Sequence, residues 1–450
     1  MNSVILAVAL AGLFFGSIYT LFKPRWAILF VVILYPLEQL LTTVSSFFVT
    51  HGKFLNLLVG GLAVVGAAAA FMGGKRPFKC YLNPVSILTA LLYLWALIGV
   101  GYTPDMQKGT DDLVRALPYL GLFLVFPGLL INDLSDFRKL ITPMLIFGAL
   151  IVVLILTSPS TAMHGGRLGI ESVAGAENEI QNPLATATLG GTIAIIAVLH
   201  KPGQHILFGN LARLAALGAG LAIAMLSGSR GQLLGACGIS LLMFPFARQI
   251  KNLVQFVTVS VAGFVVVSVG FAVLSLVTTS DAAGRWDQAA LDSGVGTRWL
   301  MIKTLLDAYL SSPLHLLQGL GTSSFLTYWG HEQPPYIHNM PAQVLTENGL
   351  IGVAILGLLM LFVVKSAVGL LKMCRDYPDD LATAAILVGV CLYQLVLSFK
   401  QGNYAISGAP FWWFMVLSKI YYRTHHEVVE AQLAYSYEMA YAEPELSGAV

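Results

Sequence analysis

The chain has 450 residues, of which 57% are hydrophobic and 11% charged, and its formal net charge at pH 7 is +2. Soluble domains carry about 25% charged residues, so this balance excludes an ordinary soluble protein and indicates a membrane protein. Neither a basic tract nor a series of basic residues interleaved with aromatic ones is present in the sequence. The composition therefore argues against a nucleic-acid partner.

Apolar runs of about twenty residues, the length needed to cross roughly 30 Å of hydrocarbon, recur along the whole chain. We predict membrane spans at 4–22, 26–49, 54–73, 84–102, 113–131, 140–157, 184–199, 206–226, 231–246, 253–277, 342–364, 381–398 and 406–420. The first run lacks a positively charged start and a small-residue cleavage site, so we interpret it as a retained span rather than a signal peptide. Pro118 and Pro127 would kink the fifth. The sequence predicts an all-α polytopic integral membrane protein with about 12–14 transmembrane helices.

Basic residues indicate the orientation of the chain. Most of the 25 lysines and arginines fall in short loops that alternate onto one side of the membrane, which is therefore expected to be cytoplasmic. We predict a single polytopic membrane domain over residues 1–420 and a cytoplasmic tail over 421–450. The long polar segment 278–341 is then an extracytoplasmic loop.

Metal-binding residues are sparse on the predicted outer side. The four cysteines fall in cytoplasmic loops or within spans, and no Cys/His cluster has the spacing of a zinc site. Asp111 and Asp112 form the one tight outer carboxylate pair, but a pair at the start of a helix more often complements the helix dipole. We predict a site that uses no metal and no cofactor.

The loop 278–341 has a pattern of its own. From Arg298, apolar residues recur at helical spacing until Pro313 ends the run. Such a helix is too short to span and amphipathic enough to lie on the membrane surface. The residues 319–323 predict a flexible turn, and two prolines stiffen the chain shortly before His338. We interpret the loop as a lid that excludes water from an active site.

These motifs resemble, in their order and spacing, the O-antigen ligase and Wzy-type polysaccharide polymerase superfamily over roughly residues 160–365. The resemblance rests on Ser229-Arg230-Gly231 after a span, Arg298 opening a loop helix, Pro313 with Gly319 and Gly321, His338-Asn339, and Glu347 with Gly349-Leu350-Ile351-Gly352. It implies a C-type membrane glycosyltransferase fold in the bacterial inner membrane. It also implies metal-independent transfer of a glycan from an undecaprenyl diphosphate carrier to an acceptor hydroxyl, on the periplasmic or extracellular side.

The chemistry of a lipid diphosphate donor favours arginine. The diphosphate is a good leaving group that needs cationic partners rather than a general acid, and the planar guanidinium binds phosphate oxygens in pairs. Arg230 is the strongest candidate, because an arginine at the bilayer centre costs about 2.5–3.5 kcal/mol on insertion scales and Gly228 and Gly231 would let the backbone approach a ligand. The alternative is an arginine that extends to the membrane interface.

Three further arginines are candidate diphosphate ligands. Arg167 resembles the outer-loop arginine of the family, ahead of an Asn-Pro helix start, and otherwise is a solvated loop charge. Arg298 lies where the family has its loop arginine. Arg285, between a glycine and a tryptophan, is a weaker rival for the same role.

His338 is the candidate catalytic base. Its unperturbed pKa near 6.5 suits removal of a proton from a sugar hydroxyl, and nearby arginines would lower that pKa and keep the ring neutral. The alternative is a histidine that only caps the following helix. Glu347 lies inside the next span, where a carboxylate needs a partner, so we expect it to orient an arginine or the histidine.

The sequence does not separate two acceptors. A polymerase would pass the glycan to another lipid-linked repeat, and a ligase to lipid A-core; we favour the polymerase. The expected partners are the lipid-linked donor, the acceptor, the bilayer and other polysaccharide assembly proteins. A different class, a polytopic transporter or flippase, predicts internal repeats and paired broken helices, and the sequence shows no convincing repeat.

Overall fold

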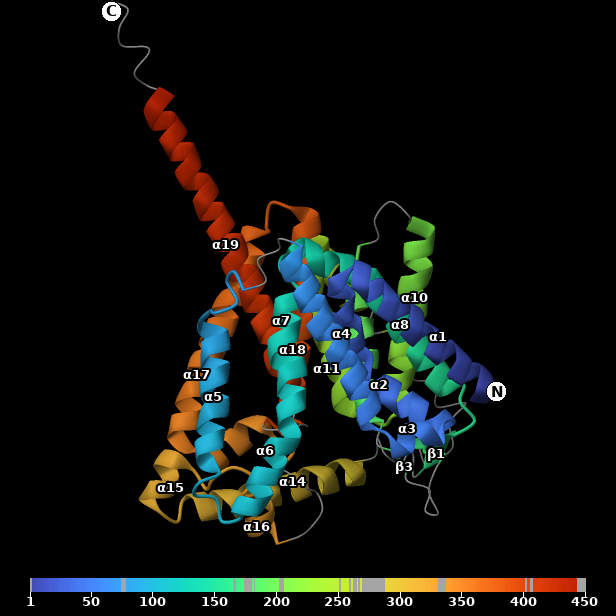
Figure 1. The fold of residues 1–450 in the computed structure, drawn as a ribbon, viewed down its shortest axis with the longest axis vertical. Coiled ribbons are helices and arrows are strands. Elements are labelled where there is room, and N and C mark those ends of the chain that lie inside the picture. The colour runs from blue at the N-terminus through green and yellow to red at the C-terminus, as the bar shows by residue number, and fades with distance from the viewer. Residues whose placement is uncertain are drawn as a thin grey trace, which may run out of the picture.

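The computed structural model is a bundle of helices (Figure 1). It describes residues 2–73, 78–164, 167–173, 180–181, 183–201, 206–250, 252–258, 260–261, 265, 268, 288–330, 337–400, 403–404 and 408–442. The elements before the sheet are α1 (Asn2–Phe22), η1 (Pro24–Trp26), α2 (Ala27–Val44), α3 (Ser46–Thr50), α4 (Lys53–Met72), α5 (Pro84–Gly99), α6 (Met106–Leu120), η2 (Gly121–Val125), α7 (Phe126–Leu130) and α8 (Leu134–Leu156). The others are β1 (Thr161–His164), β2 (Arg167–Glu171), β3 (Ile180–Gln181), α9 (Leu184–Leu199), α10 (Ile206–Leu226), α11 (Arg230–Arg248), α14 (Gln288–Tyr309), α15 (Pro313–Gln318), α16 (Phe325–Trp329), α17 (Met340–Met373), α18 (Pro378–Ser398) and α19 (Ala409–Ala442).

Eight helices of the described chain are long and apolar enough to cross a membrane. They are Asn2–Phe22, Pro24–Val44, Lys53–Met72, Leu134–Leu156, Gly209–Leu226, Arg230–Arg248, Met340–Met373 and Pro378–Ser398. Two shorter apolar helices, α5 and α9, coincide with further predicted spans. The predicted kinked span contains the π-helical turn η2 between its two prolines, and most of 253–277 lies outside the described residues. The prediction of an all-α polytopic membrane protein is confirmed.

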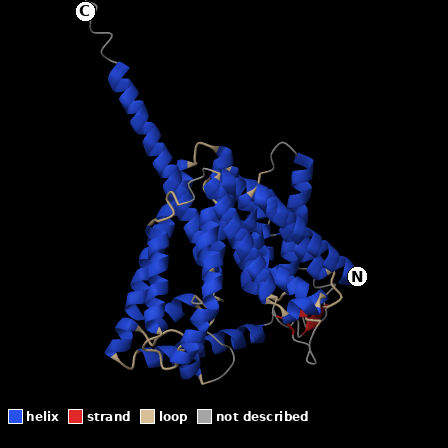
Figure 2. Ribbon diagram, in the orientation of Figure 1, coloured by secondary structure: helices blue, strands red, loops and turns tan. Residues whose placement is uncertain are grey.

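The bundle has two different ends. One end, which we call the loop face, carries α14, α15, α16 and the small sheet β1–β3 (Figure 1; strands red in Figure 2). The helix α19 leaves the bundle at the other end, the C-terminal face. Between the two faces, α2, α9 and α18 are buried on almost every side. The first residues of α11 and α17 and the last residues of α18 therefore meet at the loop face.

The small sheet was not predicted from the sequence. Its three antiparallel strands have the order β1-β2-β3, and His164 is paired with Arg167 across β1 and β2. The sheet is attached to the end of α2, because Val173 N donates to the carbonyl of Thr42 at 3.1 Å and Gln181 Nε2 donates to Thr42 Oγ1 at 2.9 Å. These strands have two to five residues, which is too short for an alternating pattern to identify them.

The helix α17 is broken at Gly349, whose φ is 64° and ψ is −164°. Only glycine adopts this backbone conformation readily. The break frees two carbonyls of the preceding turn, which accept hydrogen bonds from the loop: Leu320 N donates to Thr346 O at 2.8 Å, and Gly321 N donates to Glu347 O at 3.0 Å. We call this pairing of residues 319–321 with residues 346–349 the backbone lock.

The backbone lock requires glycine on both sides. A Cβ on Gly319 would overlap the backbone of Glu347, and a Cβ on Gly349 would overlap the carbonyl of Leu317. The next loop residue, Thr322, donates from Oγ1 to Ala96 O in α5 at 2.5 Å. The prediction of a flexible turn at 319–323 is therefore wrong, because the backbone groups of this segment bind two helices.

The helix α14 forms a small core with the segments that follow it. It begins at Gln288, before the predicted start at Arg298. Leu300 on α14 and Leu310 directly after it are exposed. The buried residues of this core are Met301, Leu305, Tyr309, Leu320, Phe325 and Ile337. One face of α14 thus packs on α16 and the start of α17, and Leu300 lies on another face.

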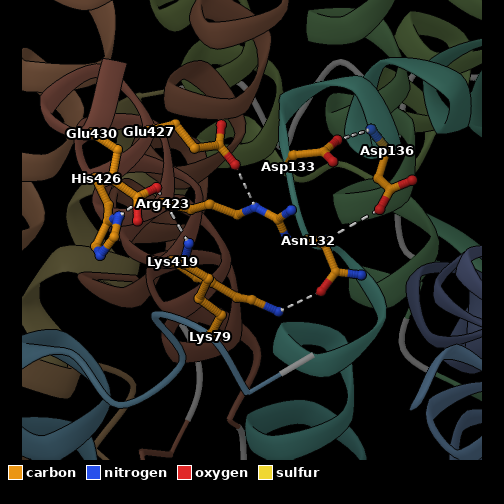
Figure 3. A network of polar contacts seen from close by, with 9 residues as sticks. All are labelled: Lys79, Asn132, Asp133, Asp136, Lys419, Arg423, His426, Glu427 and Glu430. Carbon is orange, nitrogen blue, oxygen red and sulfur yellow. Dashed lines mark hydrogen bonds and ion pairs between the residues drawn. The ribbon is translucent and has the colours of Figure 1, made fainter. Parts of the chain in front are cut away.

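A polar network holds α19 at the C-terminal face (Figure 3). Lys419 is fully buried, and its Nζ donates to Gly128 O at 2.6 Å and to Asn132 Oδ1 at 3.1 Å. The backbone N of Asn132 donates to Asp136 Oδ2 at 3.3 Å, and Asp136 is ion-paired with Arg25 at 2.8 Å. These contacts tie α19 to α7, α8 and η1.

The helix α19 does not end at the predicted membrane boundary. It continues to Ala442, whereas we expected the segment after 420 to be a solvated tail. Two pairs at i,i+4 spacing stabilise the extension, Arg423 with Glu427 at 3.0 Å and His426 with Glu430 at 3.1 Å. The apolar first part of α19 and its polar extension therefore form one continuous helix.

We predict that Gly349→Ala lowers the free energy of unfolding by about 1–3 kcal/mol through backbone strain, because alanine rarely adopts this φ and ψ. The overlap of its Cβ with Leu317 lowers the stability further. The matched control is Gly357→Ala in the same helix, where an added Cβ meets nothing within 4 Å. Thermal melting of the purified variants in detergent measures the difference. Equal melting temperatures for the two variants would contradict the backbone lock.

Candidate active site

Lys400 lies at the centre of a basic cluster on the loop face. It follows the end of α18, is half-buried, and donates from Nζ to Gln232 Oε1 at 2.6 Å. Its pKa is lowered to about 8, first by burial and then by the positive charges of Arg298, Arg167 and Arg230. All three arginines are therefore close enough to Lys400 to repel its ammonium group. The structure brings together three of the four arginines that the sequence singled out.

Arg230 opens α11 from a tight, buried turn. The preceding helix α10 ends at Leu226, and Gly228 has a left-handed φ of 63°. Ser227 and Ser229 are buried, and Ser229 N donates to Ser227 Oγ at 3.3 Å. The reversal places Arg230 at the N-terminus of α11, where the helix dipole adds to its positive charge. This end of α11 thus favours an anion.

The other two arginines reach the cluster from outside the bundle. Arg167 is the first residue of β2 and is half-buried, and the sheet attached to α2 holds it in place. Arg298 lies on α14 with an exposed side chain. Arg285 lies outside the described residues. Each of the three placed arginines belongs to a different element, so the cluster exists only in the folded chain.

His338 lies next to this cluster. Its φ of 57° is in the left-handed region, which histidine occupies more often than most residues, and its side chain is half-buried. Its pKa is lowered to about 4 by burial and, second, by the charge of Arg298. The ring is therefore neutral at pH 7, as the sequence led us to expect, although burial contributes more than the arginine does.

Asn339 joins two helices beside His338. Its Oδ1 accepts from Ala342 N at 2.9 Å and so caps α17, and Pro341 occupies the first turn. Its Nδ2 donates to the carbonyl of Phe399 at 3.2 Å. Because Phe399 precedes Lys400, this one side chain connects the start of α17 to the basic cluster.

Glu347 is fully buried in a neutral polar network. Its Oε2 accepts from Gln343 Nε2 at 3.1 Å, and the same amide group donates to Asn403 Oδ1 at 3.1 Å. Within the described chain no arginine forms an ion pair with Glu347. Of the two expected partners, an arginine or the histidine, the arginine is therefore wrong, and Gln343, one helical turn away, binds Glu347 instead.

The network continues beneath the loop. Asn348 Nδ2 donates to Tyr404 Oη at 2.5 Å, and Tyr404 N donates to Gln343 Oε1 at 3.4 Å. Tyr93 Oη donates to Tyr404 O at 2.7 Å, and Trp95 Nε1 donates to Asn348 O at 3.0 Å. These contacts fix the chain after α18 against α5 and the broken part of α17.

An apolar cavity of about 400 Å³ opens beside these groups, between α2, α9, α17, α18 and α19. Its walls include Val31, Leu189 and Trp412. Its polar lining comes from the site itself, through Asn403 and Tyr404. The lining also includes Ser398, two residues before Lys400.

The sequence interpretation missed five residues of this region. From the sequence, Lys400 is a candidate for lining an acceptor groove but is more typical of an interface anchor, and Gln232, Gln343, Asn403 and Tyr404 carry no motif. Their one common feature in the sequence is a polar group inside or next to an apolar run, which also describes many residues of the interface. In the part of the chain described here, no group of three His, Cys, Asp or Glu residues is arranged to hold a metal ion, and metal independence stays a prediction.

We predict that Asn339→Ala lowers the melting temperature more than Asn339→Asp does. Alanine removes both the cap, worth about 0.5–2 kcal/mol, and the bond to Phe399, whereas aspartate still caps α17 but cannot donate to a carbonyl. Thermal melting of both variants beside the wild type tests this order. Two variants that melt with the wild type would show that neither bond positions the start of α17.

The comparison with known proteins agrees with this geometry. Residues 215–357 match the family model described as O-antigen ligase. The matched range includes Arg230, Arg298, His338 and Glu347, and it lies within residues 160–365, which carry the resemblance in sequence. No curated protein matches the chain. Over residues 215–357, this multi-pass membrane protein is therefore similar to the O-antigen ligase family.

Proposed function

We propose that the protein transfers a glycan from undecaprenyl diphosphate to an acceptor hydroxyl by metal-independent inverting displacement. The observation that carries this proposal is the convergence of Arg167, Arg230 and Arg298 around Lys400, next to a neutral His338. A group of like charges with three half-buried members is unfavourable by itself and favours a multivalent anion. A histidine that is neutral at pH 7 supplies the base that such a transfer requires.

The donor fits the two parts of the site. Its diphosphate would bind the arginines, whose planar groups match pairs of phosphate oxygens. Part of its isoprenoid chain would occupy the apolar cavity, whose lining reaches Met340, two residues after His338. The anomeric carbon, joined to the diphosphate, would then lie between the arginines and the histidine.

The reaction needs one proton acceptor. The acceptor oxygen attacks the anomeric carbon as His338 takes its proton, and the bond from that carbon to the diphosphate oxygen breaks. The electron pair of that bond leaves with the diphosphate, where the arginines stabilise the added charge. Glu347 would not touch the substrate. Its hydrogen bond to Gln343 would position α17, which follows His338, and Gln343 in turn binds Asn403, in the segment that follows Lys400.

The acceptor and the membrane follow from the proposed reaction class. The loop face would be periplasmic or extracellular, in a bacterial inner membrane, because its basic residues are outnumbered by those of the C-terminal face.

A gel assay of the purified protein with lipid-linked oligosaccharide distinguishes the products. A ladder indicates a polymerase, our preferred reading. One shifted band that needs lipid A-core indicates a ligase. No covalent product with any acceptor would overturn the proposal in favour of a transporter.

We predict that His338→Ala lowers the rate of glycan transfer about 10²–10⁴-fold, the usual contribution of a general base. The control is His51→Ala, because His51 is an exposed histidine directly after α3. Elution profile and melting temperature check that both variants are folded. With a pKa of about 4, His338 becomes protonated as the pH falls, so kcat/KM of the wild type should decline through about pH 4. Full activity of the folded alanine variant would exclude His338 as the base.

We predict that Arg230→Lys is nearly as damaging as Arg230→Ala. Lysine keeps the positive charge but cannot bind two phosphate oxygens through one planar group. A hydrogen bond to a charged group contributes about 1.5–3 kcal/mol, so kcat/KM for the lipid-linked donor should fall about 10-fold or more in both variants. If the lysine variant has the wild-type kcat/KM, the guanidinium geometry is not required.

A further inference from the structure

The ammonium group of Lys400 does not bind the end of its own helix, α18. Its backbone N donates to Leu397 O at 2.9 Å, and a lysine so close to a helix end often uses its side chain to bind the last carbonyls of that helix. Here the ammonium group instead donates to Gln232 in α11, at 2.6 Å. No carboxylate of the described residues forms an ion pair with it.

Two neighbouring residues of α11 prepare the position of this ammonium group. Gln232 is fully buried, and its Oε1 is directed at the lysine. A Cβ on Gly231 would lie 2.9 Å from Lys400 Nζ and still closer to Cδ, so glycine leaves the space that the lysine stem occupies. Both residues directly follow Arg230, the first residue of α11.

Among the described residues, three positive charges act on Lys400. Arg298 on α14, Arg167 on β2 and Arg230 on α11 face it from three elements, and together with burial they lower its pKa. An ammonium ion has three hydrogens, and the hydrogen bond to Gln232 uses one. The folded chain therefore holds a desolvated cation among other cations, in the arrangement that a bound anion would stabilise.

We propose that Lys400 is a fourth ligand of the donor diphosphate, and that Gly231 and Gln232 position it. This inference rests on the proposed function and adds a binding residue outside the matched family range. Lys400 contributes a compact point charge, which complements the paired hydrogen bonds of the arginines. As the bond from the anomeric carbon to the diphosphate oxygen breaks, that oxygen gains charge, and the ammonium group stabilises it without transferring a proton.

The experiment measures donor binding and turnover in three proteins: the wild type, Lys400→Met, and Lys303→Met as the control. Lys303 is an exposed lysine on α14 of the same face. Binding is measured with undecaprenyl diphosphate, and with undecaprenol to report the lipid chain alone. Lys400→Met should weaken binding of the diphosphate about 10-fold to 100-fold and leave undecaprenol unchanged. Lys303→Met should bind both as the wild type does.

The melting temperature of Lys400→Met shows whether Lys400 binds the diphosphate or only supports the fold. Removing a half-buried ammonium group that lies near like charges should leave the stability of Lys400→Met unchanged or higher, whereas loss of a lysine that supports the fold would lower the stability.

A second pair of variants, in α11, tests the positioning of Lys400. Gly231→Ala should displace Lys400 and weaken diphosphate binding. Gly238→Ala should not, since a Cβ there meets nothing within 4 Å.

The pH profile of kcat/KM tests the inference independently of the binding measurements. The ammonium form is the binding form, so kcat/KM should fall as the pH rises through about 8. In Lys400→Arg that decline should move to higher pH, because a guanidinium stays protonated. A wild type that transfers glycan while Lys400→Met binds the diphosphate equally well would overturn the inference alone. A wild type that neither binds nor transfers would overturn the proposed function with it.

Discussion

The backbone lock between the loop and the broken helix α17 is the constraint on which the loop face depends. Two main-chain hydrogen bonds cross from Leu320 and Gly321 to the carbonyls of Thr346 and Glu347, and both exist because Gly349 interrupts the helix. The interruption costs little in free energy, since the carbonyls that lose helical partners gain the loop N–H groups. Once formed, it fixes α15, α16 and the start of α17 as one layer over the bundle. The histidine and the buried polar network both belong to that layer.

The basic cluster depends on elements that are separate in sequence. Burial makes each added positive charge more costly, and burial together with the three arginines lowers the pKa of Lys400. The bundle tolerates the repulsion because each cation is held by its own element: a strand attached to α2, the N-terminus of α11, the loop helix and the end of α18.

The sequence predicts the membrane class, because the composition and the recurring apolar runs follow directly from the thickness of the bilayer. It also predicts a ligand-binding role for Arg230, because an arginine at the edge of an apolar run is costly unless it has a role, whereas the roles of Arg298 and His338 are predicted from the resemblance. It misses what depends on packing between distant segments. The partner of Glu347 is Gln343 rather than an arginine, and the glycines at 319 and 321 serve close backbone contact rather than flexibility. Periodicity and composition describe each segment alone, and therefore cannot give such pairings.

The two hydrogen bonds of Asn339 have a mechanical consequence. One caps the helix that follows His338 and the other holds the carbonyl just before Lys400, so the two residues are joined through a single short side chain. A shift of α17 relative to α18 would have to break the bond from Asn339 Nδ2 to the carbonyl of Phe399 before the gap between the two residues could change. The spacing between the proposed base and the proposed phosphate ligand is thus restrained by local geometry.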